Sequence, residues 1–397
     1  MDERTNLSAG ISLPSDFHFG EVSSNAPHFR TTELALSPSV STPGLGSLAA
    51  FAGTWTGSGF NTIFRPNSNQ TPTQLPVQPP GPPLDNVLEL NLTTESLAFS
   101  PSLGSVPNRG MVQGDVFLNG VPYLQTISDV TIPSQKTGIH VEPGIWIIVP
   151  PTTNPAEGET LVRMASIPHG TTIMAQGKSR VINGPPTIPK VDITPFITRT
   201  NEPVRFDNQT AAKPGTSRIP QDLTAFIAAG TITQAMLDDP NTFLRNHIAG
   251  QKIISTTEIN VATAAKPPLF GGGTDNIAFL EGDATSTSPN ANAVTMTATF
   301  WIETVEHTIL VPIFKPGQPP LTISGEAPRA HGHPVPRFLV NPPIEITKPR
   351  TIKVHSTQIQ YTQEVMLNFN TLTWPHVSVA TLAPAGVIPI PPSVWTT

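Results

Sequence analysis

The chain has 397 residues, of which 37% are hydrophobic and 13% are charged, and its formal net charge is −6. This length suits one large domain or two ordinary ones, and the weak charge, with no run of five like charges, excludes nucleic acid and anionic membrane surfaces as expected partners. The chain has no cysteine, which excludes disulfides, thiolate catalysis and cysteine-ligated zinc or iron–sulfur sites.

Proline is unusually frequent, with 46 residues. Because proline cannot donate to a helix or a sheet ladder, this composition favours a β-rich protein with stiff connections. The first residues, MDERTNLSAG, lack the apolar segment of a secretory signal, and no stretch of eighteen apolar residues occurs. We therefore expect no membrane span and a cytoplasmic location.

The N-terminal part divides into two segments. Residues 1–44 are polar and irregular, and we expect an arm that lies on the surface or reaches another copy of the chain as a homo-oligomer contact. Residues 45–181 alternate between apolar and polar positions and form the first part of a predicted antiparallel up-and-down β-barrel, whose closure removes exposed sheet edges. The expected strands of this segment are 53–64, 87–99, 122–131, 138–151, 160–169 and 171–181.

The second half begins with a Pro-rich connector over 182–250. It contains two helical patterns, 221–229 and 241–249, with a one-turn piece between them. Strands then resume over 251–397 and are expected to extend and close the barrel. Their predicted ranges are 252–264, 271–283, 292–314, 350–369 and 372–382.

Five short motifs occur in the order found in one known family. They are GTWTGSG (53–59), YLQTISD (123–129), HVEPGIWII (140–148), ASIPHGTTIMAQG (165–177) and WPHVSVATL (374–382). This order resembles the nitrobindin-like heme-binding β-barrels, which belong to the calycin group with the fatty-acid-binding proteins and lipocalins. The resemblance covers about 48–180 and 350–385. It implies a mainly β, calycin-like barrel, enlarged here by a long insertion with two short helices.

The closing strand carries His376 within an otherwise apolar run. By strand alternation, Trp374, His376 and Ser378 share one face, where they would line a cavity for a small apolar or planar ligand. The resemblance implies that His376 is the proximal iron ligand of heme b. The alternative interpretation is a core histidine bonded to a backbone carbonyl, or one at the barrel mouth.

Other candidate site residues lie on the earlier strands and turns. The resemblance favours His169, in IPHGTTI, as a distal catalytic group, and Arg109 as the partner of a heme propionate, ahead of Arg65 and Arg163. Trp146 and Met164 would line the pocket. Simpler interpretations stay open: a solvated turn histidine, a loop arginine and ordinary core side chains.

Three functions remain open from the sequence. The first is a heme protein that handles nitric oxide, peroxynitrite or peroxide, with an uncertain isomerase or peroxidase-like activity. The second is a metal-free carrier or enzyme for an apolar small molecule, and the third is a self-assembling structural protein. His140 and Glu142, two positions apart on one strand face, are expected to form an ion pair in any of them.

Overall fold

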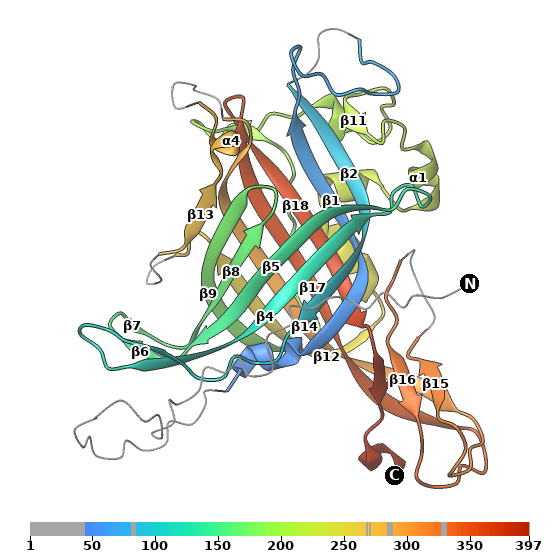
Figure 1. Cartoon of the computed structure of the whole chain (residues 1–397). Helices are drawn as coiled ribbons and strands as arrows, with labels where there is room; N and C mark the ends of the chain where they lie inside the picture. The colour runs from blue at the N-terminus through green and yellow to red at the C-terminus, as the bar shows by residue number, and fades with distance from the viewer. Residues whose placement is uncertain are drawn as a thin grey trace, which may run out of the picture.

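The computed structural model describes residues 44–80, 85–266, 269, 271–283, 289–326 and 332–396. Ten long antiparallel strands form a closed barrel in the order β2-β1-β18-β17-β14-β12-β9-β8-β5-β4, with β4 pairing back to β2 (Figure 1). The predicted mainly β, antiparallel barrel is therefore confirmed. The ten strands are β1 (Gly53–Pro66), β2 (Asn86–Phe99), β4 (Val116–Asp129), β5 (Thr137–Val149), β8 (Thr160–Ile167), β9 (Thr171–Asn183), β12 (Lys252–Ala262), β14 (Asn292–Val311), β17 (Arg350–Phe369) and β18 (Leu372–Pro384).

Strand alternation separates the side chains into a luminal set and an outer set. We call the end with the β4–β5, β8–β9 and β17–β18 turns the upper end, and the opposite end the lower end (Figure 1). On β18, Ala380 and Leu382 belong to the luminal core, whereas Val377 and Val379 pack outside. This period-two pattern is the one from which the sequence predicted strands.

The lower end of the lumen is closed by apolar side chains. The 3-10 helix η1 (Gly46–Phe51) inserts Leu48 and Phe51, both fully buried, and Trp55 donates its indole N–H to the Phe51 carbonyl at 2.9 Å. The Phe51 ring stacks on Phe99 with centroids 4.7 Å apart. Luminal residues from all sides of the barrel complete this cluster, which we call the lower plug.

The insertion between β9 and β12 covers the outer face of β1, β2 and β18. It contains η2 (Asp207–Gln209), α1 (Thr224–Ala229), α2 (Gln234–Asp238) and α3 (Asn241–Ile248), so both predicted helices and the piece between them are present. We call the resulting apolar layer the outer cluster. Its fully buried members include Phe60, Phe64, Leu88, Leu90, Leu237, Leu244, Trp301, Trp374, Val377 and Val379.

Several short strands and one short helix lie outside the ten barrel strands. Predicted strand 271–283 is shorter than expected, because β13 (Gly273–Asn276) ends early and α4 (Ala278–Glu281) follows. The chain leaves the sheet there to cross the β8–β9 turn, where Ile277 donates its N–H to the Gly170 carbonyl at 2.8 Å. The remaining short strands are β3 (Val106–Asn108), β6 (Thr152–Thr153), β7 (Ala156–Glu157), β10 (Phe196–Ile197) and β11 (Arg218–Ile219).

The lower ends of β14 and β17 run beyond the barrel and carry a second core. A three-stranded sheet of β15 (Leu321–Ser324), β16 (Arg337–Val340) and β19 (Val387–Pro389), with η3 (Pro392–Trp395), packs against them. We call this part the lower extension (Figure 1). Its buried residues include Ile309, Val311, Phe314, Phe338, Val340, Ile352, Val354 and Trp395.

Two expectations are only partly addressed by this fold. The arm predicted over 1–44 lies, apart from residue 44, outside the described residues, and so does its proposed role in oligomer contacts. Within the described ranges, none of the helices has the length and apolar character needed to cross a membrane.

Candidate functional site

Three histidines gather at the upper end of the barrel, each from a different element. The rings of His140, near the start of β5, and His169, in the β8–β9 turn, have centroids 5.6 Å apart. His376 points inward from β18, since its neighbour Val377 packs in the outer cluster. His376 is nonetheless partly exposed to solvent.

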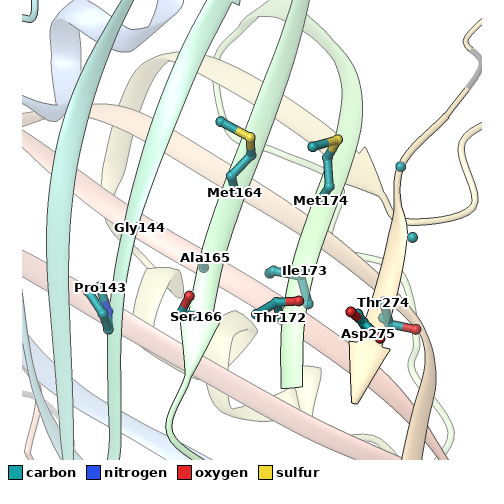
Figure 2. A pocket seen from close by; sticks show the side chains of 12 residues that line it. Pro143, Gly144, Met164, Ala165, Ser166, Thr172, Ile173, Met174, Thr274 and Asp275 are labelled. Carbon is teal, nitrogen blue, oxygen red and sulfur yellow. The ribbon is translucent and has the colours of Figure 1, made fainter. Parts of the chain in front are cut away.

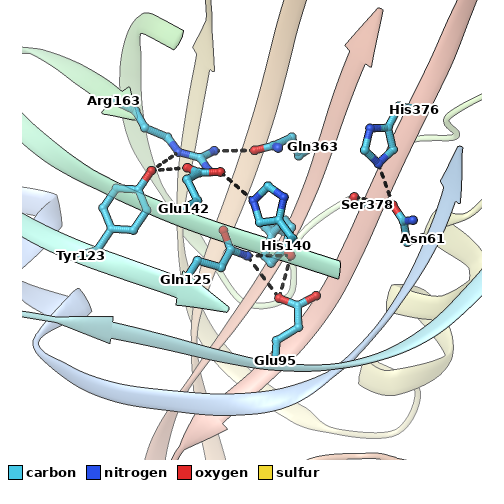
Figure 3. A network of polar contacts seen from close by, with 11 residues as sticks. Asn61, Glu95, Tyr123, Gln125, His140, Glu142, Arg163, Gln363, His376 and Ser378 are labelled. Atoms are coloured by element: carbon cyan, nitrogen blue, oxygen red, sulfur yellow. Dashed lines mark hydrogen bonds and ion pairs between the residues drawn. The ribbon is translucent and has the colours of Figure 1, made fainter. Parts of the chain in front are cut away.

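His376 is held by a directed chain of hydrogen bonds, which begins with its contact to Asn61 (Figure 3). Its Nε2 lies 2.8 Å from Asn61 Oδ1, which also accepts the hydroxyl of Ser378 at 2.8 Å. Asn61 donates its amide to Asn91 at 2.9 Å, and Asn91 donates to Asp129 at 3.1 Å. Because a carboxylate only accepts, Asp129 orients both amides, so Asn61 presents its oxygen to the imidazole and Nε2 carries the proton.

The charge state of His376 follows from its surroundings. Burial, followed by the positive charges of His140 and His169, lowers its pKa to about 3. The imidazole is therefore neutral near pH 7, with its lone pair on Nδ1. Among the described residues, no hydrogen bond reaches that Nδ1, so the ring is an available acceptor. Burial and the charge of His140 also lower the pKa of His169.

Below the histidines, charged side chains cross the lumen. Arg163 of β8 donates to Glu142 at 2.6 Å, to the Tyr123 hydroxyl at 2.9 Å and to Gln363 of β17 at 2.7 Å (Figure 3). Strands β14, β12 and β9 separate β17 from β8, so the bond to Gln363 spans the interior. Tyr123 also donates to Glu142. We call these crossing contacts the polar floor.

The ionisation of the polar floor is set by mutual charge compensation. Burial alone would raise the pKa of Glu142, but the charge of Arg163 and hydrogen bonds from His140 and Tyr123 lower it to about 2. The expected contact between His140 and Glu142 is confirmed, with Nε2 3.2 Å from Oε2. The Arg163 guanidinium also lies 5.3 Å from the Phe300 ring centroid, above the lower plug.

A second crossing completes the polar floor. Tyr361 of β17 donates to Glu95 of β2 at 2.7 Å, and Gln125 of β4 lies 3.0 Å from the Tyr361 hydroxyl and 3.2 Å from Glu95. Burial raises the pKa of Glu95 to about 7, although hydrogen bonds from Tyr361 and Gln125 oppose the rise. The lumen is thus filled at mid-height, and a ligand entering from above meets polar groups.

The structure brings together only part of the predicted site. His376, Ser378 and His169 all lie at the upper end, as expected for luminal or rim residues. Trp374 does not join them, although alternation predicted one shared face. It belongs to the outer cluster, where it stacks on Phe206 and Phe369, with centroids 5.4 and 4.5 Å away.

Trp146, Met164 and Arg109 also lie away from His376. Trp146 is buried in the lower plug, and Arg109 pairs with Asp115 beyond the start of β4, near the lower end. Met164 points outward from β8, because the inward positions of that strand are taken by residues such as Arg163. The positions of these three side chains depend on the strand register, and on which alternate residues of each strand face the lumen, across the whole barrel. The short sequence motifs do not contain this information.

Met164 instead lines a groove of about 560 Å³ on the outer wall (Figure 2). Met174 is its cross-strand neighbour on β9 and is 44% exposed, while Thr274 and Asp275 of β13 form the opposite side. The groove is therefore separated from the three histidines by the barrel wall.

The arrangement of potential ligand side chains determines whether the site can bind a metal ion. Within the described ranges, no three histidine, aspartate or glutamate side chains are placed to bind one metal ion together. A single-histidine heme site would need His376 Nε2, the usual ligand atom, which here donates to Asn61. Heme would also need a flat apolar space, whereas the polar floor and the Asn61 chain lie beside the ring. In this arrangement the residues do not fit heme.

Several residues of the site were not selected from the sequence. Asn61 lies 315 positions from His376, and Glu95 lies 266 positions from Tyr361. The sequence indicates Arg163 only as a possible propionate partner. The local sequence gives one signal, which is a polar residue at an inward position of an apolar strand. This signal identifies His376 as a luminal side chain, but it does not identify Asn61 as its hydrogen-bond partner.

Comparison with known proteins gives one weak structural similarity and no family for this sequence. No known protein family matches the sequence, and no curated protein matches it at a significant level. The fold is weakly similar to the crystal structure of Rv2717c from M. tuberculosis, with a TM-score of 0.32 and 10% identity over 87% of this chain and 98% of that one. A likeness of this size carries no inference about function.

Proposed function

We propose that the upper end of the barrel binds a small uncharged ligand that carries hydrogen-bond donors, and that it does so without a metal. The observation that supports this proposal is the neutral His376, which faces the lumen and has no partner on Nδ1 among the described residues. A hydroxyl or amide N–H of a ligand would donate to that lone pair. The expected ligand is therefore more polar than the apolar molecule predicted from the sequence.

The directed chain from Asp129 supports ligand selection. It holds the His376 proton on Nε2, because Asn61 offers only its oxygen to the ring. An imidazole with a fixed tautomer accepts from a neutral donor but gains nothing from an anion at Nδ1. A site of this kind disfavours analogues that lack the donor, because a bound analogue would cover the His376 acceptor and leave it without a partner.

The polar floor sets the depth of the proposed site. Arg163 and Glu142 compensate each other, so they offer no net charge to a ligand above them. His140 and His169 stand between this floor and solvent, and they are the neighbours that a ligand bound to His376 would contact next. We therefore expect a compact molecule held by several hydrogen bonds.

Heme binding remains a prediction to be tested beside this proposal. It would require His376 to release Asn61 and the lumen to open beside the ring. Titration with hemin separates the two hypotheses, since a stoichiometric Soret band that is lost in His376→Ala would support iron coordination and contradict metal-free binding.

The direct test follows the His376 ring by long-range proton–nitrogen NMR in the full chain. We expect the neutral Nε2–H tautomer at pH 7, and selective shifts of its Nδ1 signal when small diols, amides or sugars are added. His376→Ala should weaken binding of a hit at least tenfold. His355→Ala is the matched control, because His355 lies near the start of β17, toward the lower end, with its side chain 49% exposed. Hits that shift no His376 signal, or that bind equally to His376→Ala, would contradict the proposal.

A further inference from the structure

A second pocket lies outside the barrel wall, under α3. Its volume is about 580 Å³, within the range of small-molecule sites. We call it the α3 groove. It is formed where six parts of the chain meet: 56–59 of β1, 92–94 of β2, Val130 after β4, 229–247 of the insertion, 332–337, and 383–385 at the end of β18.

The inner side of the α3 groove is apolar. Met236 and Phe243 come from α2 and α3, and Leu92 comes from the outer face of β2. A thioether beside an aromatic ring accommodates both aliphatic and aromatic bodies, because both side chains are polarisable. This side would hold the apolar part of a ligand.

The charge of the α3 groove has one sign. Among the described residues that line it there is no aspartate or glutamate, and Arg337 is the one with a permanent charge. His247 also lines the groove, but burial, and then the charge of His333, lowers its pKa to about 3, so it is neutral. The remaining polar side chains are hydroxyls and an amide: Thr56, Ser58, Thr94, Thr231 and Asn246.

Arg337 is placed to bind an anion. It lies on β16 and is exposed, and its Nη2 donates to the Ala385 carbonyl at 3.2 Å. Among the described residues it forms no salt bridge, so the rest of its guanidinium fork remains available. A guanidinium binds a carboxylate through two parallel hydrogen bonds.

We propose that the α3 groove binds a small carboxylate with an apolar body, the carboxylate at Arg337 and the body against Met236 and Phe243. This site is separate from the upper end of the barrel. His376 faces the lumen, whereas the groove is bounded by the outer residues Ser58 and Thr94, which are register partners on β1 and β2. The two sites can therefore be tested independently.

The test uses 4-phenylbutyrate and its uncharged analogue 4-phenylbutanol, titrated into the full chain by calorimetry. We expect saturable binding of the carboxylate, weakened about tenfold in Arg337→Gln, with less than a twofold change for the alcohol. Arg109→Gln is the matched control, because this exposed arginine pairs with Asp115, does not line the groove, and should leave both affinities unchanged when replaced.

A second variant tests the location of the body. Thr94→Trp should fill the α3 groove from the barrel wall and abolish binding of both compounds, while the thermal midpoint stays close to that of the parent protein. No saturable binding of the carboxylate, or an affinity unchanged in Arg337→Gln, would overturn the proposal. Loss of binding in His376→Ala but not in Thr94→Trp would also overturn it, since the ligand would then lie in the lumen.

Discussion

The lower and upper halves of the lumen are built by the same ten strands but differ in chemistry. The lower plug is dry and aromatic, with Phe51, Phe99 and Trp146 in direct contact. The upper end carries His140, His169 and His376, which solvent reaches. Strand alternation determines which side chains point into the lumen. The difference between the two halves shows that the type of these inward residues determines whether that part of the lumen is an apolar core or a candidate binding site.

The polar floor is the boundary between these halves. Arg163 contacts the aromatic rings of the lower plug on one side and Glu142 on the other. A buried ion pair of this kind contributes little net stability when intact, but it is costly to break. It separates the two levels and fixes the depth that a ligand can reach.

The largest expected effect comes from breaking this boundary. Arg163→Met leaves Glu142 buried without its counter-charge, and we expect the free energy of unfolding to fall by about 4 kcal/mol. Urea denaturation of the full chain measures it. The double variant Arg163→Met/Glu142→Gln should lose about 2 kcal/mol less than the sum of the single changes. Strict additivity would show that the pair is not coupled.

The lower plug should respond as an ordinary core. Phe51→Ala removes a fully buried ring packed on Phe99 and Trp146, and the expected loss is about 3 kcal/mol. The same denaturation experiment measures it, and the His376 NMR signals should stay unchanged. A displaced His376 signal would mean that the two halves are not separate.

The polar floor should also respond to pH. The pKa of Glu95 is raised to about 7 in the folded protein, so the folded chain keeps a proton that the unfolded chain releases above about 4.5. Stability should therefore fall by about 2 kcal/mol between pH 5 and pH 7 on account of this group. Glu95→Gln should remove that slope.

His376 and Glu303 are the controls for this pH dependence. The lowered pKa of His376 gives a slope of opposite sign, with stability lost as pH falls from 6.5 towards 3. Burial raises the pKa of Glu303 on the outer face to about 8, and its slope should persist in Glu95→Gln. An unchanged profile in Glu95→Gln below pH 7 would contradict the expected ionisation.

The smallest effect is expected at the upper end itself. Ser378→Ala removes one hydrogen bond to Asn61, and the free energy of unfolding should fall by about 1 kcal/mol. The Nε2–H tautomer of His376 should survive, since Asp129 still orients the amides. Conversion to the Nδ1–H tautomer would show that Ser378, rather than the chain from Asp129, fixes the ring.

Much of the fold was predictable because the alternation of apolar and polar residues that marks a strand lies within a short stretch of sequence. The predicted range 350–369 coincides with β17, and 87–99 differs from β2 by one residue. The prediction over 271–283 failed after residue 276, because the chain turns there to pack Ile277 on the β8–β9 turn, a contact set by distant sequence.

The candidate site was less predictable, since its contacts join strands far apart in the chain. The inward direction of His376 followed from alternation, but its bond to Asn61 depends on the pairing of β1 with β18. Alternation predicts the same inward direction for Trp374. Its ring instead stacks on Phe206 of the insertion and on Phe369 at the β17–β18 turn, within the outer cluster. Side-chain partners across a barrel require the complete strand order.

The continuity of β14 and β17 has a consequence for dividing this chain. Each strand is 20 residues long and passes without a break from the barrel wall into the lower extension. Trimming the extension away would leave Ile309, Val311 and Ile352 uncovered on a protruding two-stranded ribbon, an adhesive edge in solution. The barrel and the lower extension should therefore unfold in a single transition, and the junction between them is not a suitable truncation site.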